Sequence, residues 1–201
     1  MTAWMEVASQ MNDLARAIAK PIRKEDLGKM IAKSEPAKRG HEGVGRYLQG
    51  FVMLPKFRAS SKKEAIEKMV SEIAAACPNH VKNADEAVEA VLKREESMPT
   101  GMTNSLAFPH GRTDAVTEII GAVAIIGAAE GGVIEGLGDY ETMDHSAVKV
   151  IVLTVAPETK QSPYLQLMAF VSRALRGEGA MKELMDCTTA AEMKRFFKKA
   201  R

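Results

Sequence analysis

The segment from Thr100 to Arg112 (TGMTNSLAFPHGR) concentrates side chains that could perform chemistry. It places the imidazole of His110 between Pro109 and Gly111, directly after a short apolar run. Pro109 disfavours a helical conformation at the residue before it, so we expect the chain to reach His110 extended. Gly111 allows another part of the protein to approach closely. A neutral imidazole can attack as a nucleophile near neutral pH and leave again readily, which suits reversible phosphoryl transfer.

Other polar side chains near His110 could take part in such a transfer. The moving phosphoryl group spreads negative charge over three oxygens and needs fixed donors around them. Arg94 offers a planar, permanently charged fork of donors, and Thr100 and Asn104 offer a hydroxyl and an amide. Simpler roles stay open: Arg94 as a favourable cation at a helix C-terminus, and Thr100 and Asn104 as residues that shape the loop. We expect Glu95 to brace Arg94 or the loop.

A histidine alone is weak evidence for catalysis, and the chain has four: His41, His80, His110 and His145. The longer string around His110 is more specific. Thr-Gly-x-x-Asn-x-x-Ala-x-Pro-His-Gly-Arg resembles the active-site signature of the fructose/mannitol-type IIA domain of the bacterial phosphotransferase system, a family that includes the nitrogen-regulatory IIA proteins. Arg94 and Glu95 before the signature, and an Ala-Pro pair at 156–157 after an apolar strand, match the family as well. The resemblance covers roughly residues 50–201.

The resemblance implies a function and partners. His110 would accept a phosphoryl group from the phosphohistidine carrier HPr, with Arg94 assisting. It would then pass the group to a cysteine of a IIB domain, or hold it as a signal for a regulatory target protein. The protein would be a phosphotransferase component with a phosphohistidine intermediate, and neither a cofactor nor a metal ion is expected.

Three positions depart from the family pattern: Tyr164, Ser105 and Pro99, which stands where a small polar residue is common. Many members carry a second histidine near the start of the helix after the Ala-Pro strand, and Tyr164 stands there in this chain. A phenol can still donate a hydrogen bond, but it supplies no positive charge. Ser105 stands where a glycine usually follows the signature Asn104. The alternative function is therefore a non-catalytic interaction module that kept the fold and lost transfer.

The chain divides into two parts by charge and composition. Residues 1–48 carry nine Lys and Arg against six Asp and Glu, whereas residues 49–201 carry 19 against 20. Apolar residues at steps of three and four from Trp4 to Ile18 predict an amphipathic helix. The polar, glycine-containing stretch 34–45 reads as a linker. We therefore predict a helical extension and linker at 1–48 and a IIA-like phosphotransfer domain at 49–201.

The second part alternates apolar strands with helices. Strands are expected near residues 51–54, 117–127, 131–137 and 148–155, with the last covered on both faces because it is almost wholly apolar. Helices are expected after the caps Ser61 and Asn83, after Ser162 followed by Pro163, over 180–185, and after Thr188. This alternation predicts an α/β fold, a mixed sheet with helices on both faces.

Composition limits the function classes. The net charge of +2 is too small to indicate nucleic-acid binding, and no apolar stretch approaches the roughly 20 residues of a membrane span. The first residues lack the order of a signal peptide, and Cys77 and Cys187 suggest neither a disulfide framework nor a metal site. We expect a cytoplasmic protein that neither enters a membrane nor binds nucleic acid.

Overall fold

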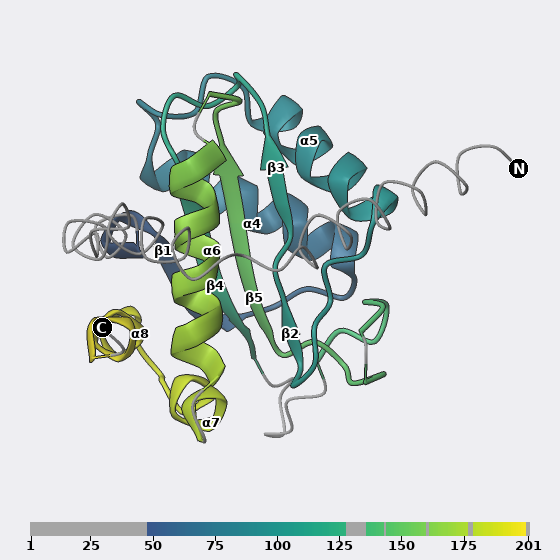
Figure 1. Ribbon diagram of the computed structural model, residues 1–201, viewed down its shortest axis with the longest axis vertical. Coiled ribbons are helices and arrows are strands. Elements are labelled where there is room, and N and C mark those ends of the chain that lie inside the picture. Colours follow the sequence, from purple (N-terminus) through teal and green to yellow (C-terminus); the bar gives the residue numbers. More distant parts are fainter. Residues whose placement is uncertain (1–47, 128–135, 143, 160, 177–178, 200–201) are drawn as a thin grey trace, which may run out of the picture. The chain divides into compact units, whose positions relative to one another are not determined.

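The computed structural model describes residues 48–127, 136–142, 144–159, 161–176 and 179–199 (Figure 1). Within residues 161–176 the side chains of 161–165, 168 and 176 are not described. The extension and linker expected over residues 1–48 therefore lie outside the described part, apart from Leu48. Among the described residues, no helix is both long enough and apolar enough to cross a bilayer.

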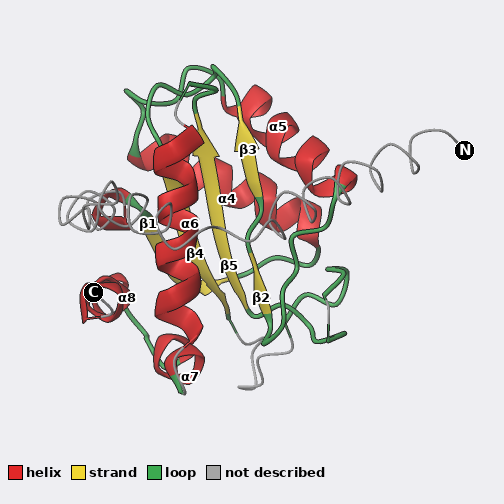
Figure 2. Ribbon diagram, viewed as in Figure 1, coloured by secondary structure: helices red, strands yellow, loops and turns green. Residues whose placement is uncertain are grey.

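Strands and helices alternate along the described chain (Figure 2). The elements are β1 (Val52–Phe57), α4 (Lys62–Ala76), α5 (Ala84–Ser97), β2 (Leu106–Ala107), β3 (His110–Arg112), β4 (Ile120–Ile126), β5 (Val150–Ala156), α6 (Gln161–Arg176), α7 (Ala180–Met185) and α8 (Ala190–Lys199). The strand expected over 131–137 falls mostly outside the described residues, and only Leu137 forms an isolated bridge, with Val148.

The five strands form one mixed sheet, which confirms the predicted α/β class. The order is β1-β4-β5-β2, and β3 also pairs with β5. β4 and β5 are antiparallel, whereas β1 is parallel to β4 and both β2 and β3 are parallel to β5. β2 and β3 thus follow the same edge of β5, and Phe108 and Pro109 separate them. Proline cannot donate to the ladder, so an edge is where it is tolerated.

Side chains of the two central strands alternate between two apolar clusters. Val123, Ile125, Val150 and Val152 pack in one cluster with residues of α6, α7 and α8. Ala122, Ala124, Ile151 and Leu153 pack in the other with residues of α4 and α5. Figure 1 accordingly shows α6 in front of the sheet and α4 behind it. Because side chains alternate along a strand, this arrangement fixes which residues of the edge strands face α6 and which face α5.

Local sequence signals begin most of the helices where expected. The Ser61 hydroxyl accepts a hydrogen bond from the Glu64 N–H, and the Asn83 amide oxygen accepts one from the Glu86 N–H. Before α8, the Glu192 carboxylate accepts from the Thr188 and Thr189 N–H groups, and the Thr189 hydroxyl accepts from the Glu192 N–H. This reciprocal pattern is the predicted capping box.

The predicted start of α6, at Pro163 after a Ser162 cap, was wrong by two residues. The helix already begins at Gln161, so Ser162 lies inside it and is not its cap. Pro163 still falls in the first turn, where the missing N–H has no helical partner to lose. The sequence signal therefore located the helix correctly but misplaced its first residue.

Candidate functional site

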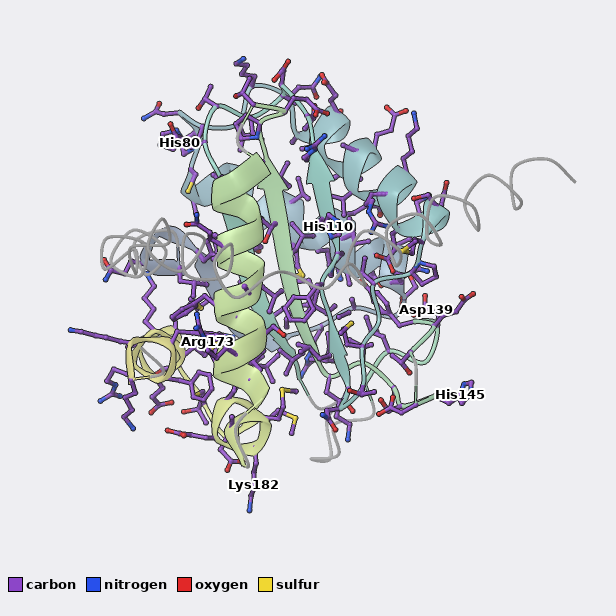
Figure 3. The ribbon with its side chains drawn as sticks, viewed as in Figure 1. His80, His110, Asp139, His145, Arg173 and Lys182 are labelled. Atoms are coloured by element: carbon purple, nitrogen blue, oxygen red, sulfur yellow. The ribbon has the colours of Figure 1, made fainter. Side chains whose placement is uncertain are left out.

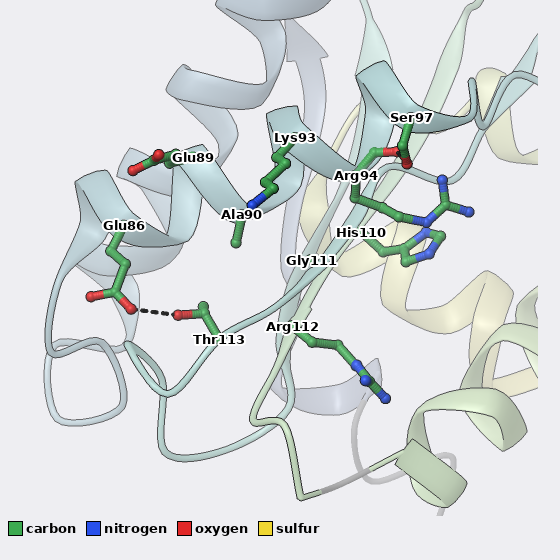
Figure 4. A pocket seen from close by; sticks show the side chains of 10 residues that line it. All are labelled: Glu86, Glu89, Ala90, Lys93, Arg94, Ser97, His110, Gly111, Arg112 and Thr113. Atoms are coloured by element: carbon green, nitrogen blue, oxygen red, sulfur yellow. Dashed lines mark hydrogen bonds between the residues drawn. The ribbon is translucent and has the colours of Figure 1, made fainter. Parts of the chain in front are cut away.

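The candidate site lies where β3 meets α5. A cleft of about 680 Å³ runs between them, and Arg94, Ser97, His110 and Gly111 are among its lining residues (Figure 4). A Cβ atom at Gly111 would lie 2.8 Å from the backbone nitrogen of Val91 in α5. Only a glycine lets the helix backbone come this close to the strand. The close approach predicted for Gly111 is therefore confirmed, and α5 is the surface that approaches.

His110 opens β3 and is half-buried beside the last turns of α5. Its Nδ1 lies 2.9 Å from the carbonyl oxygen of Phe108. A carbonyl can only accept, so Nδ1 carries the hydrogen and Nε2 carries the lone pair in the neutral ring. The bond is local, from a residue two positions earlier in the extended chain. The bond fixes the tautomer in which Nε2 carries the lone pair that could attack an electrophile.

Several groups set the pKa of His110. Burial disfavours the charged ring and is the largest cause of a pKa below the usual 6.5. The hydrogen bond to Phe108 and the negative charge of Glu95 oppose this, whereas the positive charge of Arg94 adds to it. The net lowering keeps the imidazole neutral at neutral pH, which is the form that attacks phosphorus.

Arg94 lies in the last turn of α5, and Figure 4 shows its guanidinium beside the His110 ring. Nη1 donates to the carbonyl oxygen of Met98 at 2.8 Å, just beyond the helix end. The residue therefore fills both roles that the sequence left open, as a cation at the helix C-terminus and as a neighbour of the imidazole. Direct contact of Arg94 with a phosphoryl group stays a prediction.

Glu95 and Thr100 form a buried pair behind the site. The side chain of Glu95 is 1% exposed and that of Thr100 is 8% exposed. Glu95 accepts two hydrogen bonds from Thr100, from the N–H at 3.0 Å and from the hydroxyl at 2.5 Å. Glu95 thus braces the loop that leads to β2, which was one of its two expected roles. The Thr100 hydroxyl is engaged by this carboxylate.

Asn104 lies at the other end of the edge strand from His110. Leu106 pairs with Val150, whereas His110 pairs with Thr154, four residues further along β5, or about 13 Å. The Asn104 N–H donates to the Asp144 carboxylate at 2.9 Å. This position favours the loop-shaping role over phosphoryl contact.

The turn at Asn104 also explains the family preference for glycine after it. Asn104 and Ser105 both have positive φ angles, 63° and 62°. Glycine adopts this conformation without strain, whereas serine must be held there. The Ser105 N–H donates to the Ser146 hydroxyl at 3.1 Å, and its carbonyl accepts from Lys149 and Val150. These bonds keep the left-handed turn in place without a glycine.

The other residues considered in the sequence analysis are Tyr164, Arg112 and two exposed histidines. Tyr164 belongs to α6, but its side chain lies outside the described residues, so its role stays a prediction. Arg112 forms an ion pair with Glu158 at 3.1 Å and points away from His110 (Figure 4). His80 and His145 lie far from His110 in Figure 3, and both are exposed.

Sequence reasoning missed one polar residue of this region, Thr154. It is the Cα partner of His110 in the pairing of β3 with β5, and it is fully buried. Its sequence signal is a hydroxyl in the middle of the apolar run 150–156. Among the described residues, there is no group of three or more His, Cys, Asp and Glu side chains that could hold a metal ion.

Comparison with known proteins assigns the chain to a family. The family model described as "Phosphoenolpyruvate-dependent sugar phosphotransferase system, EIIA 2" matches residues 49–200. A nitrogen regulatory protein of Bradyrhizobium diazoefficiens is 27% identical over 132 residues, 66% of this chain and 79% of that protein. A fructose-specific EIIA component of Haloferax volcanii is 29% identical over 127 residues, 63% of this chain and 76% of that protein.

Solved structures share the fold. The nitrogen regulatory protein IIA-Ntr of Neisseria meningitidis superimposes with a TM-score of 0.62 at 21% identity, over 77% of this chain and 98% of that one. A complex of enzyme IIAMTL and phosphorylated enzyme IIBMTL from Escherichia coli gives a TM-score of 0.56 at 23% identity, over 73% of this chain and 94% of that one.

Proposed function

The chain belongs to the EIIA 2 family of the phosphoenolpyruvate-dependent sugar phosphotransferase system, a family of sugar transport and nitrogen regulation, and on that basis we propose that it carries a phosphoryl group on His110. One observation supports this function most strongly. The His110 ring is held in a single tautomer by the Phe108 carbonyl, and the Arg94 guanidinium lies beside it in an open cleft.

The proposed step exchanges one nitrogen–phosphorus bond for another. Nε2 of neutral His110 attacks the phosphorus of a donor phosphohistidine and forms a new N–P bond. The donor N–P bond breaks, and its electron pair returns to the donor imidazole. His110 keeps the hydrogen on Nδ1, so positive charge develops in its ring. The Phe108 carbonyl and the Glu95 carboxylate favour that charge, as their upward effect on the His110 pKa indicates.

Arg94 would act on the phosphoryl oxygens during this step. Its paired donors match the negative charge that spreads over them in the transition state. Its positive charge also helps to keep His110 neutral before the attack. Both effects favour transfer, because the nucleophile is available and the developing charge is stabilised.

The proposed donor is HPr, and the proposed acceptor is a IIB domain or a regulatory target protein. A solved relative of the same fold is in complex with phosphorylated enzyme IIBMTL, which supports an acceptor of that kind. The proposed location is the cytoplasm, where such carriers act. Residues 49–201 are proposed as the phosphotransfer domain and residues 1–48 as an extension.

Intact-mass measurement tests the proposed transfer. The protein is incubated with phosphoenolpyruvate, enzyme I and HPr, and we expect a gain of one phosphate that is labile in acid and stable in base. His110→Ala should abolish the gain. His80→Ala is the matched control, because His80 is an exposed histidine that contacts Thr117, and it should leave labelling unchanged.

The alternative function is a IIA-like interaction module without transfer. It predicts a folded parent protein that takes up no phosphate under these conditions. Labelling that persists in His110→Ala would also contradict the proposal, because another residue would then accept the phosphoryl group.

A further inference from the structure

Thr154 carries a hydroxyl that is buried inside the sheet. The residue is 0% exposed, in the centre of β5. Its Oγ1 has no hydrogen-bond partner among the residues that the structure describes. Buried hydroxyls are nearly always hydrogen-bonded, because leaving one unsatisfied is costly. Among the described residues, the resting fold therefore offers no partner that accounts for this hydroxyl.

Strand register places this hydroxyl next to His110. Thr154 and His110 are Cα partners in the parallel pairing of β5 with β3, and adjacent strands lie about 4.8 Å apart. The Thr154 N–H donates to the carbonyl oxygen of Pro109 at 3.1 Å, which locks this register. Paired residues of neighbouring strands project from the same face of a sheet.

The face that both residues share is the one that α6 covers. Val152 and Ala156, two residues to either side of Thr154, pack in the cluster that contains Leu167 and Phe170 of α6. Phe108, two residues before His110, packs in the same cluster. Gly111, on the opposite face of β3, contacts α5 instead. Thr154 is therefore a polar residue that lies beside His110 on the face that α6 covers.

We propose that Thr154 is a phosphoryl-binding residue, whose hydroxyl donates a hydrogen bond to a phosphoryl oxygen once Nε2 of His110 carries the group. This inference rests on the proposed function. The hydroxyl forms no covalent bond and keeps its proton. A hydrogen bond to a charged oxygen is stronger than one between neutral groups. Because the Thr154 hydroxyl would gain this bond only when His110 is phosphorylated, it would stabilise the phosphorylated state.

The arrangement divides the phosphoryl contacts between two parts of the fold. Arg94 would reach the group from the end of α5, and Thr154 would reach it from the neighbouring strand. A strand residue is held by the ladder on both sides, so its hydroxyl is positioned before the phosphoryl group arrives. The burial of Thr154 excludes competing water from the bond.

Thr154→Val tests the inference, because valine has nearly the same shape and lacks the hydroxyl. The equilibrium of phosphoryl exchange between HPr and the full-length protein should shift against the phosphorylated form by roughly tenfold. The melting temperature of the phosphorylated form should also fall more than that of the unphosphorylated form. Thr154→Ser, which keeps the hydroxyl, should restore the exchange equilibrium. A purely structural threonine would change the melting temperatures of both forms equally and leave the exchange equilibrium unchanged.

A second phosphoryl donor separates a failure of the proposed function from a failure of the proposed role of Thr154. Phosphoramidate, which phosphorylates histidine chemically, is used beside HPr as a second donor. A parent that takes up phosphate from neither donor overturns the proposed function and this inference together. A phosphorylated parent with an equal exchange equilibrium in Thr154→Val overturns the role of Thr154 alone. If Thr154→Val fails to fold, Thr154→Ala replaces it, and the same comparison with Thr154→Ser applies.

Discussion

Gly111 of β3 and Val91 of α5 lie in direct backbone contact, and a Cβ at Gly111 would come within 2.8 Å of the Val91 nitrogen. This contact brings the helix that carries Arg94 to the strand that carries His110. The distance between these two candidate site residues therefore depends on Gly111, which has no side chain. The contact is a packing requirement that also sets the geometry of the candidate site.

Gly111→Ala should separate these two elements. The added methyl group meets backbone atoms of Ala90 and Val91, which cannot rotate away, so we expect a loss of stability of about 1–3 kcal/mol. Phosphate uptake should fall as well, because Arg94 moves with α5. Thermal melting and intact mass measure the two effects. Gly50→Ala is the control, since nothing lies within 4 Å of its added Cβ, and it should change neither. An unchanged Gly111→Ala protein would show that the contact is not a constraint.

The pH dependence of His110 follows from its lowered pKa. Burial holds the folded pKa below 6.5, so the neutral ring should persist at neutral pH and be protonated only in mild acid. The unfolded chain binds its proton at the higher, ordinary pKa, so this residue should reduce stability as the pH falls below 6.5. NMR titration of the imidazole measures the pKa directly, and a midpoint at or above 6.5 would contradict the prediction.

Glu95→Gln tests one cause of the His110 pKa. Its negative charge raises the His110 pKa against the effect of burial, so its removal should move the midpoint lower still. Loss of the carboxylate also weakens the two hydrogen bonds from Thr100, with an expected cost of about 1–3 kcal/mol. An unchanged His110 midpoint in a folded Glu95→Gln protein would show that the carboxylate does not act on the ring.

Local signals let the sequence predict much of the fold. The caps Ser61 and Asn83 and the capping box at Glu192 act within four residues, so their effect is readable without tertiary structure. The central strand over 150–156 is almost continuously apolar, as a strand covered on both faces must be. These residues belong to local patterns, and the elements they predict are present.

The sequence did not predict the short strands or the contacts between residues that are distant along the chain. β2 and β3 have two and three residues, which is too short for an alternating pattern, and the ladder with β5 creates them. The pairing of Thr154 with His110 joins residues 44 positions apart in sequence. The association of Arg94 with His110 came from the resemblance to a family, since spacing alone could not bring a helix end to a strand. The Gly111 contact supplies the physical reason.

Arg94→Lys should slow transfer although it keeps the positive charge. Lysine cannot present the paired donors of a guanidinium, and the loss of such a contact in the transition state costs about 2–4 kcal/mol. Single-turnover labelling from phosphorylated HPr measures the rate. Arg195→Lys, at an exposed position of α8, is the matched control and should transfer at the parent rate. Equal rates in a folded Arg94→Lys protein would leave Arg94 with its helix-end role alone.

A chain that begins at Arg46 tests the predicted domain boundary. It keeps Leu48 and Phe51, which are 3% and 1% exposed and belong to the cluster under α6. We expect it to melt cooperatively and to take up phosphate on His110 as the full chain does. Insolubility, or loss of labelling at His110, would show that residues 1–45 belong to the phosphotransfer domain.

Tyr164 stands where many relatives carry a second histidine, at the start of α6, whose later residues Leu167 and Phe170 cover the face that Thr154 and His110 share. If its hydroxyl reaches the phosphoryl group, Tyr164→Phe should weaken transfer by one hydrogen bond to a charged group, about 1.5–3 kcal/mol. Tyr164→His should add a titration near neutral pH, so its rate should gain a pH dependence that the parent lacks. Rates of labelling by phosphorylated HPr across pH measure both effects.

If neither substitution changes the rate or its pH profile, Tyr164 has no part in transfer. An inactive parent that Tyr164→His makes active would instead favour the interaction module, because one missing imidazole would then account for the loss of catalysis.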